Sequence, residues 1–217
     1  MVHEAEDMAE LTIFGTAASR TWRTLWMAKE VAADYTHDPV DFRTDRIKTP
    51  DYLAINPNAQ VPSMRDGDFV LWQSFAINLY LARKYPTPVS PANLEEEMPA
   101  VQWSLWTLVE IEAFIVYLLH ELEKPPTEQS AEINEHLRQK LPKPLAVLDG
   151  VLAEREYLVA DRFTVADLNT AATVRVLARI DQKLTAYPYT ERWFDACISR
   201  PAAKQAIALQ REAMADL

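Results

Sequence analysis

Short apolar runs alternate with an amphipathic segment in the N-terminal part of the chain. The compact apolar run Leu11–Phe14 predicts a short strand. The segment 19–33 carries Trp22 and Trp26 four residues apart, on one face of a predicted helix. A weaker strand signal follows at 35–42. Strand, helix and strand in this order are typical of an α/β domain.

A β-hairpin is predicted next, because the pair Asp66-Gly67 separates two apolar runs at 61–64 and 69–72. A helical pattern then begins at Ser74. With the two earlier strands, the hairpin completes a four-stranded sheet in which parallel and antiparallel pairs are mixed.

Beyond residue 99 the apolar positions recur only at helical spacing. A long helix ending at Pro125-Pro126 is expected to carry an aromatic stripe on one face. The stripe consists of Trp103, Trp106, Phe114 and Tyr117. Thr164 is the predicted N-cap of a later helix, and Asp167, at its third position, can reach back to the cap.

Between these two patterns, residues 86–98 combine several prolines with the acidic run Glu95–Glu97. Such a composition is typical of a linker. We therefore predict an α/β domain at 1–85, a linker at 86–98 and an all-helical domain at 99–217.

Composition narrows the class of protein. The hydrophobic content of 49% is enough to fill a sizeable core in 217 residues, and the formal net charge of −10 argues against nucleic acid or anionic membranes as general partners. No apolar run approaches the roughly 18 residues of a membrane span. The first residues are acidic, where a signal peptide would be basic and then apolar. These features favour a cytoplasmic protein without a membrane partner.

Cysteine and histidine usage excludes two kinds of site. Cys197 is the single cysteine, so neither an intramolecular disulfide nor a multi-thiolate zinc site can form. The four histidines lack metal-ligand spacing. We expect no bound metal, and we expect Cys197, near two aromatic residues, to be a buried thiol.

The segment around Val61-Pro62 suggests a ligand site. Proline cannot donate to a strand ladder, and with a cis bond at Val61-Pro62 the Val61 N–H and C=O would turn outward to pair with an extended peptide. Ser74 begins a helix, whose N-terminal N–H groups favour a carboxylate. Gln73 has an amide that can bond both an amine and a carboxylate. A peptide-like ligand with a carboxylate is the natural occupant.

The motif order resembles that of the soluble glutathione S-transferases. The segment Asn56–Ser63, the pair Gln73-Ser74 and the capping segment Thr164–Asp167 appear in the family's order, and the resemblance extends from Leu11 to about Leu209. It implies an N-terminal thioredoxin-like domain followed by an all-helical one. It also implies a homodimer and glutathione as co-substrate, with no permanently bound cofactor.

The resemblance also implies roles for individual residues. Ser19, at the start of the first helix, is the preferred catalytic hydroxyl that donates to the glutathione sulfur. Thr16, Thr21 or a backbone amide remain alternatives. The segment from Ser19 onward looks like that of a bacterial-type serine/cysteine branch. The residues expected to bind glutathione are Gln60, Val61, Pro62, Gln73 and Ser74.

Trp106, Phe114 and Tyr117 are candidates for an apolar pocket that holds the electrophile. Ala59 and Ala160 stand where the family usually has glycine. The expected reaction is transfer of glutathione to electrophilic, mostly apolar small molecules. Glutathione-dependent peroxide or disulfide reduction, and a non-catalytic ligand-binding role, remain alternatives.

Overall fold

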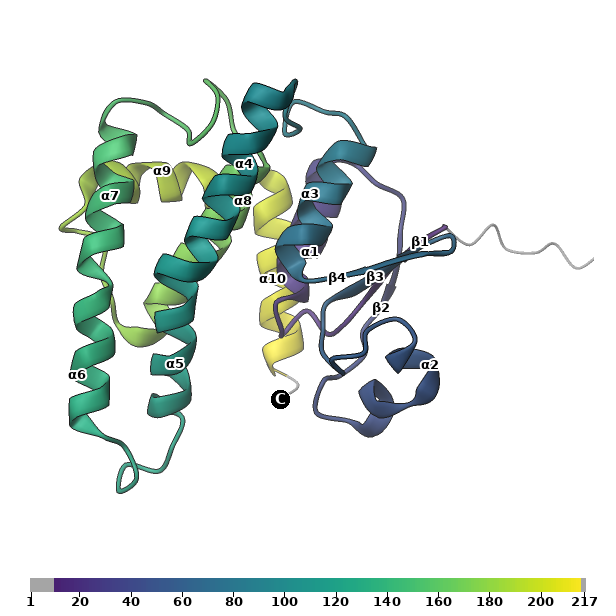
Figure 1. Cartoon of the computed structure of the whole chain (residues 1–217), viewed down its shortest axis with the longest axis horizontal. Coiled ribbons are helices and arrows are strands. Elements are labelled where there is room, and N and C mark those ends of the chain that lie inside the picture. The colour runs from purple at the N-terminus through teal and green to yellow at the C-terminus, as the bar shows by residue number, and fades with distance from the viewer. Residues whose placement is uncertain (1–9, 216–217) are drawn as a thin grey trace, which may run out of the picture. The chain divides into compact units, whose positions relative to one another are not determined.

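The computed structural model describes residues 10–215, which divide into two compact units (Figure 1). The first unit holds the residues up to Ser90 together with those from Pro201 onward, and the second runs from Pro91 to Arg200. The acidic N-terminal segment discussed above lies outside the described residues.

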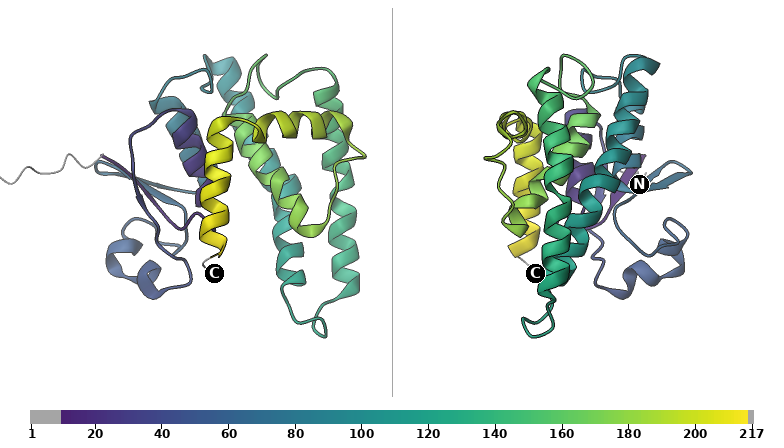
Figure 2. Two further views of the ribbon diagram at one scale, coloured as in Figure 1. Left: turned by 180° about the vertical axis from the view of Figure 1, so that it is seen from behind. Right: turned by 60° about the vertical axis from the view of Figure 1, so that its left-hand side comes forward.

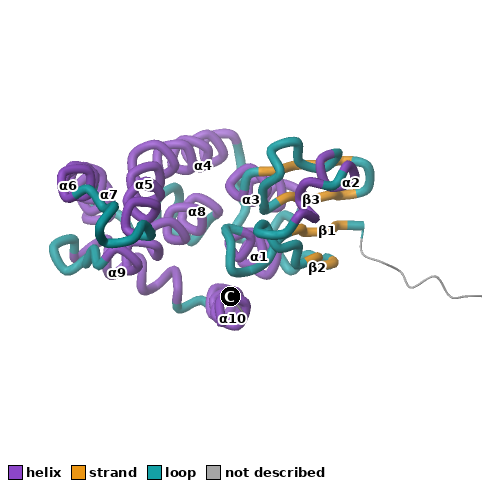
Figure 3. Tube along the Cα trace, turned by 90° about the horizontal axis from the view of Figure 1, so that it is seen from below, coloured by secondary structure: helices purple, strands orange, loops and turns teal. Residues whose placement is uncertain are grey.

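The first unit contains a four-stranded sheet in the order β2-β1-β3-β4. Figure 3 labels the first three of these strands in that order. Its strands are β1 (Leu11–Phe14), β2 (Thr36–Asp38), β3 (Ser63–Asp66) and β4 (Phe69–Trp72). β1 is parallel to β2 and antiparallel to β3, with Ile13 opposite His37 on one side and Met64 on the other. The predicted mixed sheet is therefore confirmed.

The first strand of the hairpin begins two residues later than predicted, and the turn lies one residue later than Asp66-Gly67. β3 begins at Ser63 rather than Val61, because Pro62 has no N–H to donate to a ladder. Asp66 pairs with Phe69, so the turn consists of Gly67 and Asp68, and Gly67 supplies the positive φ of 57°.

Helices cover the sheet of the first unit. They are α1 (Thr21–Glu30), α2 (Pro50–Leu53), α3 (Ser74–Lys84) and α10 (Pro201–Ala215), with a 3₁₀ turn at Asp45–Lys48. α1 packs beside both α3 and α10 (Figure 2). Trp22 and Trp26 stack with their ring centroids 5.9 Å apart and are buried. The aromatic pair expected on one helix face therefore lies in the core.

The second unit is helical and contains none of the strands in the described chain. Its helices are α4 (Leu94–Thr107), α5 (Ala113–Leu122), α6 (Ala131–Lys140), α7 (Pro142–Ala153), α8 (Val165–Val174) and α9 (Pro188–Ile198). A π-helical segment, Leu108–Glu112, joins α4 to α5, and a 3₁₀ helix, Arg175–Ile180, follows α8.

The predicted capping segment is confirmed at the start of α8. The Ala166 N–H donates to Thr164 Oγ1 at 3.3 Å, and the Thr164 N–H donates to Asp167 Oδ2 at 2.9 Å. Asp167 also accepts hydrogen bonds from the Leu158 N–H and from the Trp193 indole. Burial raises the pKa of Asp167 despite these donors. Every residue of α8 is buried, so this cap fixes the central helix of the unit.

The acidic run Glu95–Glu97 lies in the first turn of α4 and not in a linker. Asn93 caps this helix by accepting a hydrogen bond from the Glu96 N–H at 3.0 Å. Carboxylates are favoured near a helix N-terminus, so the composition that indicated a linker here begins a helix. The functional division into 1–85 and 99–217 remains a prediction.

Candidate functional site

Ser19 lies in the turn between β1 and α1 and is half-buried. Its hydroxyl donates to the Thr16 carbonyl at 2.7 Å and accepts from the Thr21 N–H at 3.1 Å. The Thr21 hydroxyl oxygen is 2.8 Å from Ser19 Oγ. Ser19 therefore satisfies the first N–H of α1 and belongs to a pair of hydroxyl groups.

Gly15 is where the Ser19 turn and the Val61 loop meet. The φ of Gly15 is 127°, and a Cβ at this position would lie 2.2 Å from Thr21 Oγ1 and 2.7 Å from Val61 Cβ. Both groups therefore approach the same backbone atom too closely for any residue but glycine. His37 Nε2 donates to the Gly15 carbonyl at 2.8 Å, which ties this turn to β2.

Three side chains hold the carbonyl of Gln60, immediately before Val61. The Tyr52 hydroxyl donates to it at 2.8 Å and the Asn56 amide at 2.7 Å, with the Ser63 hydroxyl at 3.3 Å. These three side chains are buried, and Ser63 Oγ also accepts a hydrogen bond from the Asn56 amide at 3.1 Å. Burial raises the pKa of the Tyr52 hydroxyl, so it remains a donor. We call Tyr52, Asn56 and Ser63 the carbonyl clamp.

The side-chain oxygen of Asn56 stabilises the turn that precedes Gln60. Its Oδ1 accepts from the Asn58 N–H at 3.0 Å and from the Asn58 side chain at 2.9 Å. Ala59 follows with a φ of 51°, in the left-handed region that glycine favours. The backbone here is therefore the one that a glycine would adopt, and Ala59 adopts it under strain.

The Val61-Pro62 peptide bond is cis, as expected. Within residues 10–215, neither the N–H nor the C=O of Val61 takes part in a hydrogen bond. The Val61 side chain packs against an apolar cluster that includes Phe14 and Tyr52. Val61 is therefore anchored by its side chain, and both of its backbone groups are available to a ligand.

Gln73 and Ser74 lie at the end of the hairpin. Gln73 is exposed and has a φ of 75° and a ψ of 114°. A non-glycine residue in this region is strained by about 1–3 kcal/mol, and such strain clusters at ligand sites. Ser74 begins α3 and is buried, so its N–H lies at the positive end of the helix.

The predicted electrophile residues differ in exposure. Trp106 contacts Trp103 edge-on, with centroids 5.0 Å apart, and both Trp106 and Phe114 are half-buried. Tyr117 is 65% exposed. The π-helical segment lies between Trp106 and Phe114, and its wider turn shifts the helical phase on which the predicted common face depended.

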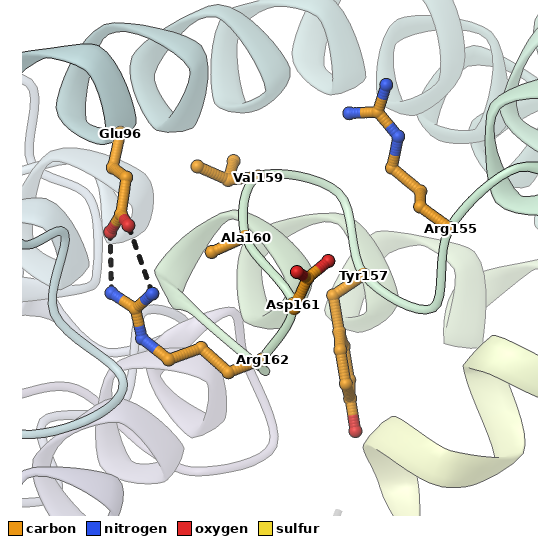
Figure 4. Close-up of a pocket in the computed structure, with 7 residues that line it drawn as sticks. All are labelled: Glu96, Arg155, Tyr157, Val159, Ala160, Asp161 and Arg162. Carbon is orange, nitrogen blue, oxygen red and sulfur yellow. Dashed lines mark hydrogen bonds and ion pairs between the residues drawn. The ribbon is translucent and has the colours of Figure 1, made fainter.

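A separate cavity of about 470 Å³ opens within the second unit (Figure 4). It is lined by Glu96, Arg155, Tyr157, Val159, Ala160, Asp161 and Arg162. Arg162 forms a two-bond ion pair with Glu96, at 3.1 and 2.5 Å, which raises the pKa of Arg162 and lowers that of Glu96. Arg155 donates to the Leu158 carbonyl at 3.3 Å. Both guanidinium groups are thus engaged in holding the segment before α8, and no predicted site residue lines this cavity.

Residues 10–215 contain neither a group placed to hold a metal ion nor a helix able to cross a membrane, and their single cysteine is buried. No group of three or more His, Cys, Asp or Glu side chains there is placed to hold a metal ion. No helix within this range is both long and apolar enough to cross a membrane. Cys197 is buried and is not part of a disulfide.

Sequence reasoning missed the residues that position the site. Tyr52 and Asn56 of the carbonyl clamp, and Gly15 and His37 beside the Ser19 turn, received no role. Asn56 precedes a proline, which is typical of a turn in which asparagine bonds the backbone two residues on. That signal could have identified Asn56, whereas the others act through contacts distant in sequence.

Family models match both parts of the chain. The glutathione S-transferase N-terminal domain matches residues 9–83, and the glutathione S-transferase C-terminal domain matches residues 106–201.

Individual proteins match over nearly the whole chain. Glutathione S-transferase 3 of Zea mays is 33% identical, over 93% of this chain and 95% of its own length. The theta class glutathione S-transferase of Xanthomonas axonopodis pv. citri, solved with glutathione bound, is 28% identical with a TM-score of 0.81, covering 92% of this chain and 97% of that one. Glutathione S-transferase-I, solved with lactoylglutathione, is 29% identical with a TM-score of 0.81, covering 92% and 99%.

Proposed function

This chain belongs to the glutathione S-transferase family, and we propose that it transfers glutathione to electrophilic, mostly apolar small molecules. In the proposed reaction, Ser19 donates a hydrogen bond that stabilises the glutathione thiolate. The sulfur then bonds to the electrophilic carbon, while the thiol proton passes to solvent and the leaving group departs with its electron pair.

The observation that carries this proposal is that Thr21, the hydroxyl partner of Ser19, meets Val61 at Gly15. The partner of the Ser19 hydroxyl, Thr21 Oγ1, and the Val61 side chain both lie against the Gly15 Cα. A peptide paired with the open backbone groups of Val61 would therefore present its side chain near Ser19. In glutathione that side chain is the cysteine thiol.

We propose the remaining binding roles on the chemistry of each group. We assign the cysteine backbone of glutathione to Val61, beside Pro62. Gln73 and Ser74 take the γ-glutamyl group, because an amide and a helix N-terminus together suit its amine and carboxylate. Gln60, which is exposed, takes the glycine carboxylate. Trp106, Phe114 and Tyr117 supply the apolar surface for the electrophile.

We also propose a homodimer of the bacterial-type serine/cysteine branch, located in the cytoplasm. Large apolar side chains are exposed on β4, namely Phe69, Val70 and Trp72, and along α4 and the π-helical segment, namely Leu94, Met98, Leu105 and Val109. Burial of such side chains between two copies would remove them from water. Light scattering should then give twice the chain mass of 24.8 kDa, and a monomer at micromolar concentration would contradict the dimer.

The test of the proposed chemistry is Ser19→Ala. A hydrogen bond to a charged group is worth about 1.5–3 kcal/mol, so conjugation should fall about 10- to 100-fold and the pKa of the bound glutathione thiol should rise. Glutathione affinity should change little. Thiolate absorbance and the pH–rate profile measure these effects, and Ser199→Ala, at an exposed helix end, is the matched control.

Assays of conjugation, peroxide reduction and disulfide reduction in parallel separate the alternatives. Because Cys197 is buried, any reductase activity would have to use the glutathione thiolate without a protein disulfide. Wild-type protein that binds glutathione but leaves its thiol pKa near the ordinary value of about 8.5 would instead indicate a non-catalytic ligand-binding protein.

A further inference from the structure

The Ser19 hydroxyl has one proton, and the structure shows where it goes. Ser19 Oγ is 2.7 Å from the Thr16 carbonyl, which can only accept, so the Ser19 proton lies on that bond. The 2.8 Å contact between Ser19 Oγ and Thr21 Oγ1 must then carry the proton of Thr21. Ser19 Oγ therefore accepts two hydrogen bonds from Thr21, one from its N–H and one from its hydroxyl.

We propose that Thr21 is a positioning residue, whose hydroxyl hydrogen bond orients Ser19 and strengthens it as a donor to the glutathione sulfur. This inference rests on the proposed function of Ser19. Thr21 is fully buried, with 0% of its surface exposed, so it acts through Ser19 and not on the sulfur itself.

Two accepted hydrogen bonds have a direct consequence for the Ser19 O–H group. They occupy the lone pairs of Ser19 Oγ, which leaves the proton as the group that Ser19 offers to a ligand. They also polarise the O–H bond, because hydrogen bonds in a chain reinforce one another. A thiolate is a charged acceptor and gains most from a polarised donor.

The structure lets the Ser19 proton move to a ligand at low cost. When Ser19 turns its O–H toward sulfur, it gives up its bond to the Thr16 carbonyl. That carbonyl keeps a second partner, because it also accepts from the Ser19 N–H at 3.1 Å. No buried carbonyl is left without a donor by the exchange.

Thr21 itself is held in place. Its Oγ1 lies against the Gly15 Cα, where a Cβ would come within 2.2 Å, and His37 fixes Gly15 through its carbonyl. The rotation of the Thr21 side chain is therefore restricted by packing, and its hydroxyl stays directed at Ser19. A valine in place of Thr21 keeps the branched shape and replaces the hydroxyl with a methyl group, which cannot donate to Ser19.

The test compares Thr21→Val, Thr21→Ser and a control at Thr24. Thr24 lies on the same helix, is equally buried, and its Oγ1 has no hydrogen-bond partner among residues 10–215. A loss of about 10–30% of the strength of one charge-assisted bond predicts a fall of about 1.3- to fivefold in kcat/KM for Thr21→Val below neutral pH. The thiol pKa of bound glutathione should rise by about 0.1–0.7, with glutathione affinity unchanged. Thr21→Ser should restore the wild-type pH profile, and Thr24→Val should not move it.

The double variant Ser19→Ala/Thr21→Val shows whether Thr21 acts through Ser19. In the Ser19→Ala background, Thr21→Val should have no further effect on the thiol pKa. An equal effect in both backgrounds, or a Thr21→Val pH profile like that of Thr24→Val, would overturn the inference while leaving the role of Ser19 intact. A Ser19→Ala variant that matches wild type would overturn both. If Thr21→Val does not fold, Thr21→Ala replaces it in the same comparison.

Discussion

Asn56→Ala should loosen the Val61 loop without touching any group that meets the ligand. Asn56 is 3% exposed and forms four hydrogen bonds through its side chain. Its amide nitrogen donates to the Gln60 carbonyl and to Ser63 Oγ, and its oxygen accepts from the backbone and side chain of Asn58. Truncation to alanine removes all four bonds together.

The expected loss of stability is smaller than the sum of these bonds. Each buried hydrogen bond contributes about 0.5–1.5 kcal/mol net, which gives an upper range of roughly 2–6 kcal/mol for four. Asn58 is exposed, so water replaces its two lost bonds. The Gln60 carbonyl keeps the Tyr52 and Ser63 hydroxyl groups as donors. We therefore expect the free energy of unfolding to fall by about 2–3 kcal/mol.

Glutathione binding should weaken as well, because the carbonyl clamp holds the peptide group next to Val61. We expect an increase in Kd of about three- to tenfold, equivalent to roughly 0.7–1.4 kcal/mol. Tyr52→Phe keeps the ring contact with Phe14, at 6.3 Å between centroids, and removes only the hydroxyl. Because Tyr52 and Asn56 share the Gln60 carbonyl, the double variant should lose more stability than the two single variants together.

Denaturant unfolding and glutathione titration measure the two quantities. Asn58→Ala is the matched control, and its free energy of unfolding should stay within about 0.5 kcal/mol of wild type. If Asn56→Ala unfolds at the wild-type denaturant midpoint and binds glutathione with unchanged affinity, the clamp does not position the loop.

Two further predictions concern other parts of the first unit. Gln73→Gly should raise the free energy of unfolding by up to about 1 kcal/mol, because glycine adopts a φ of 75° without strain. The same variant should weaken glutathione binding. A loss of stability in denaturant unfolding would refute the strain argument. Burial opposes ionisation of Asp66, but hydrogen bonds from Lys84 and Tyr80 outweigh it and lower the pKa of Asp66. The ionised Asp66 carboxylate therefore stabilises the fold at pH values above its unfolded pKa of about 3.9. This stabilisation is lost as the pH falls through the lower pKa that Asp66 has in the folded protein. Lys84→Met should cost about 1–2 kcal/mol at pH 7 and flatten the acid limb of the stability curve, whereas an unchanged acid limb would exclude Asp66 as its source.

Features with a local physical cause were predictable from the sequence. The strand β1, the Asp66-Gly67 hairpin and the α3 start at Ser74 depend on residues within a few positions of one another. The Thr164–Asp167 cap is equally local. Each needs only a turn residue, a capping side chain or a proline, so its signal survives without tertiary information.

Features that depend on distant contacts were not predictable in the same way. The strand β2 was expected at 35–42 on a weak signal and is confirmed at Thr36–Asp38, but its exact bounds depend on parallel pairing with β1. The carbonyl clamp forms only when Tyr52 and Asn56 close on Gln60. The start of α4 was misread because its acidic first turn has the composition of a linker.

Capping of α1 and catalysis use different parts of the same Ser19 hydroxyl. Capping uses the oxygen, which accepts the Thr21 N–H at 3.1 Å. Catalysis needs the proton, which Ser19 Oγ donates to the Thr16 carbonyl at 2.7 Å. When this bond breaks, the carbonyl still accepts a hydrogen bond from the Ser19 N–H. Ser19→Ala therefore removes both functions, and its effect on stability cannot by itself distinguish them. Thr21→Val separates the two, because it preserves the cap on the α1 N–H and alters only the hydroxyl that holds the proton donor in place.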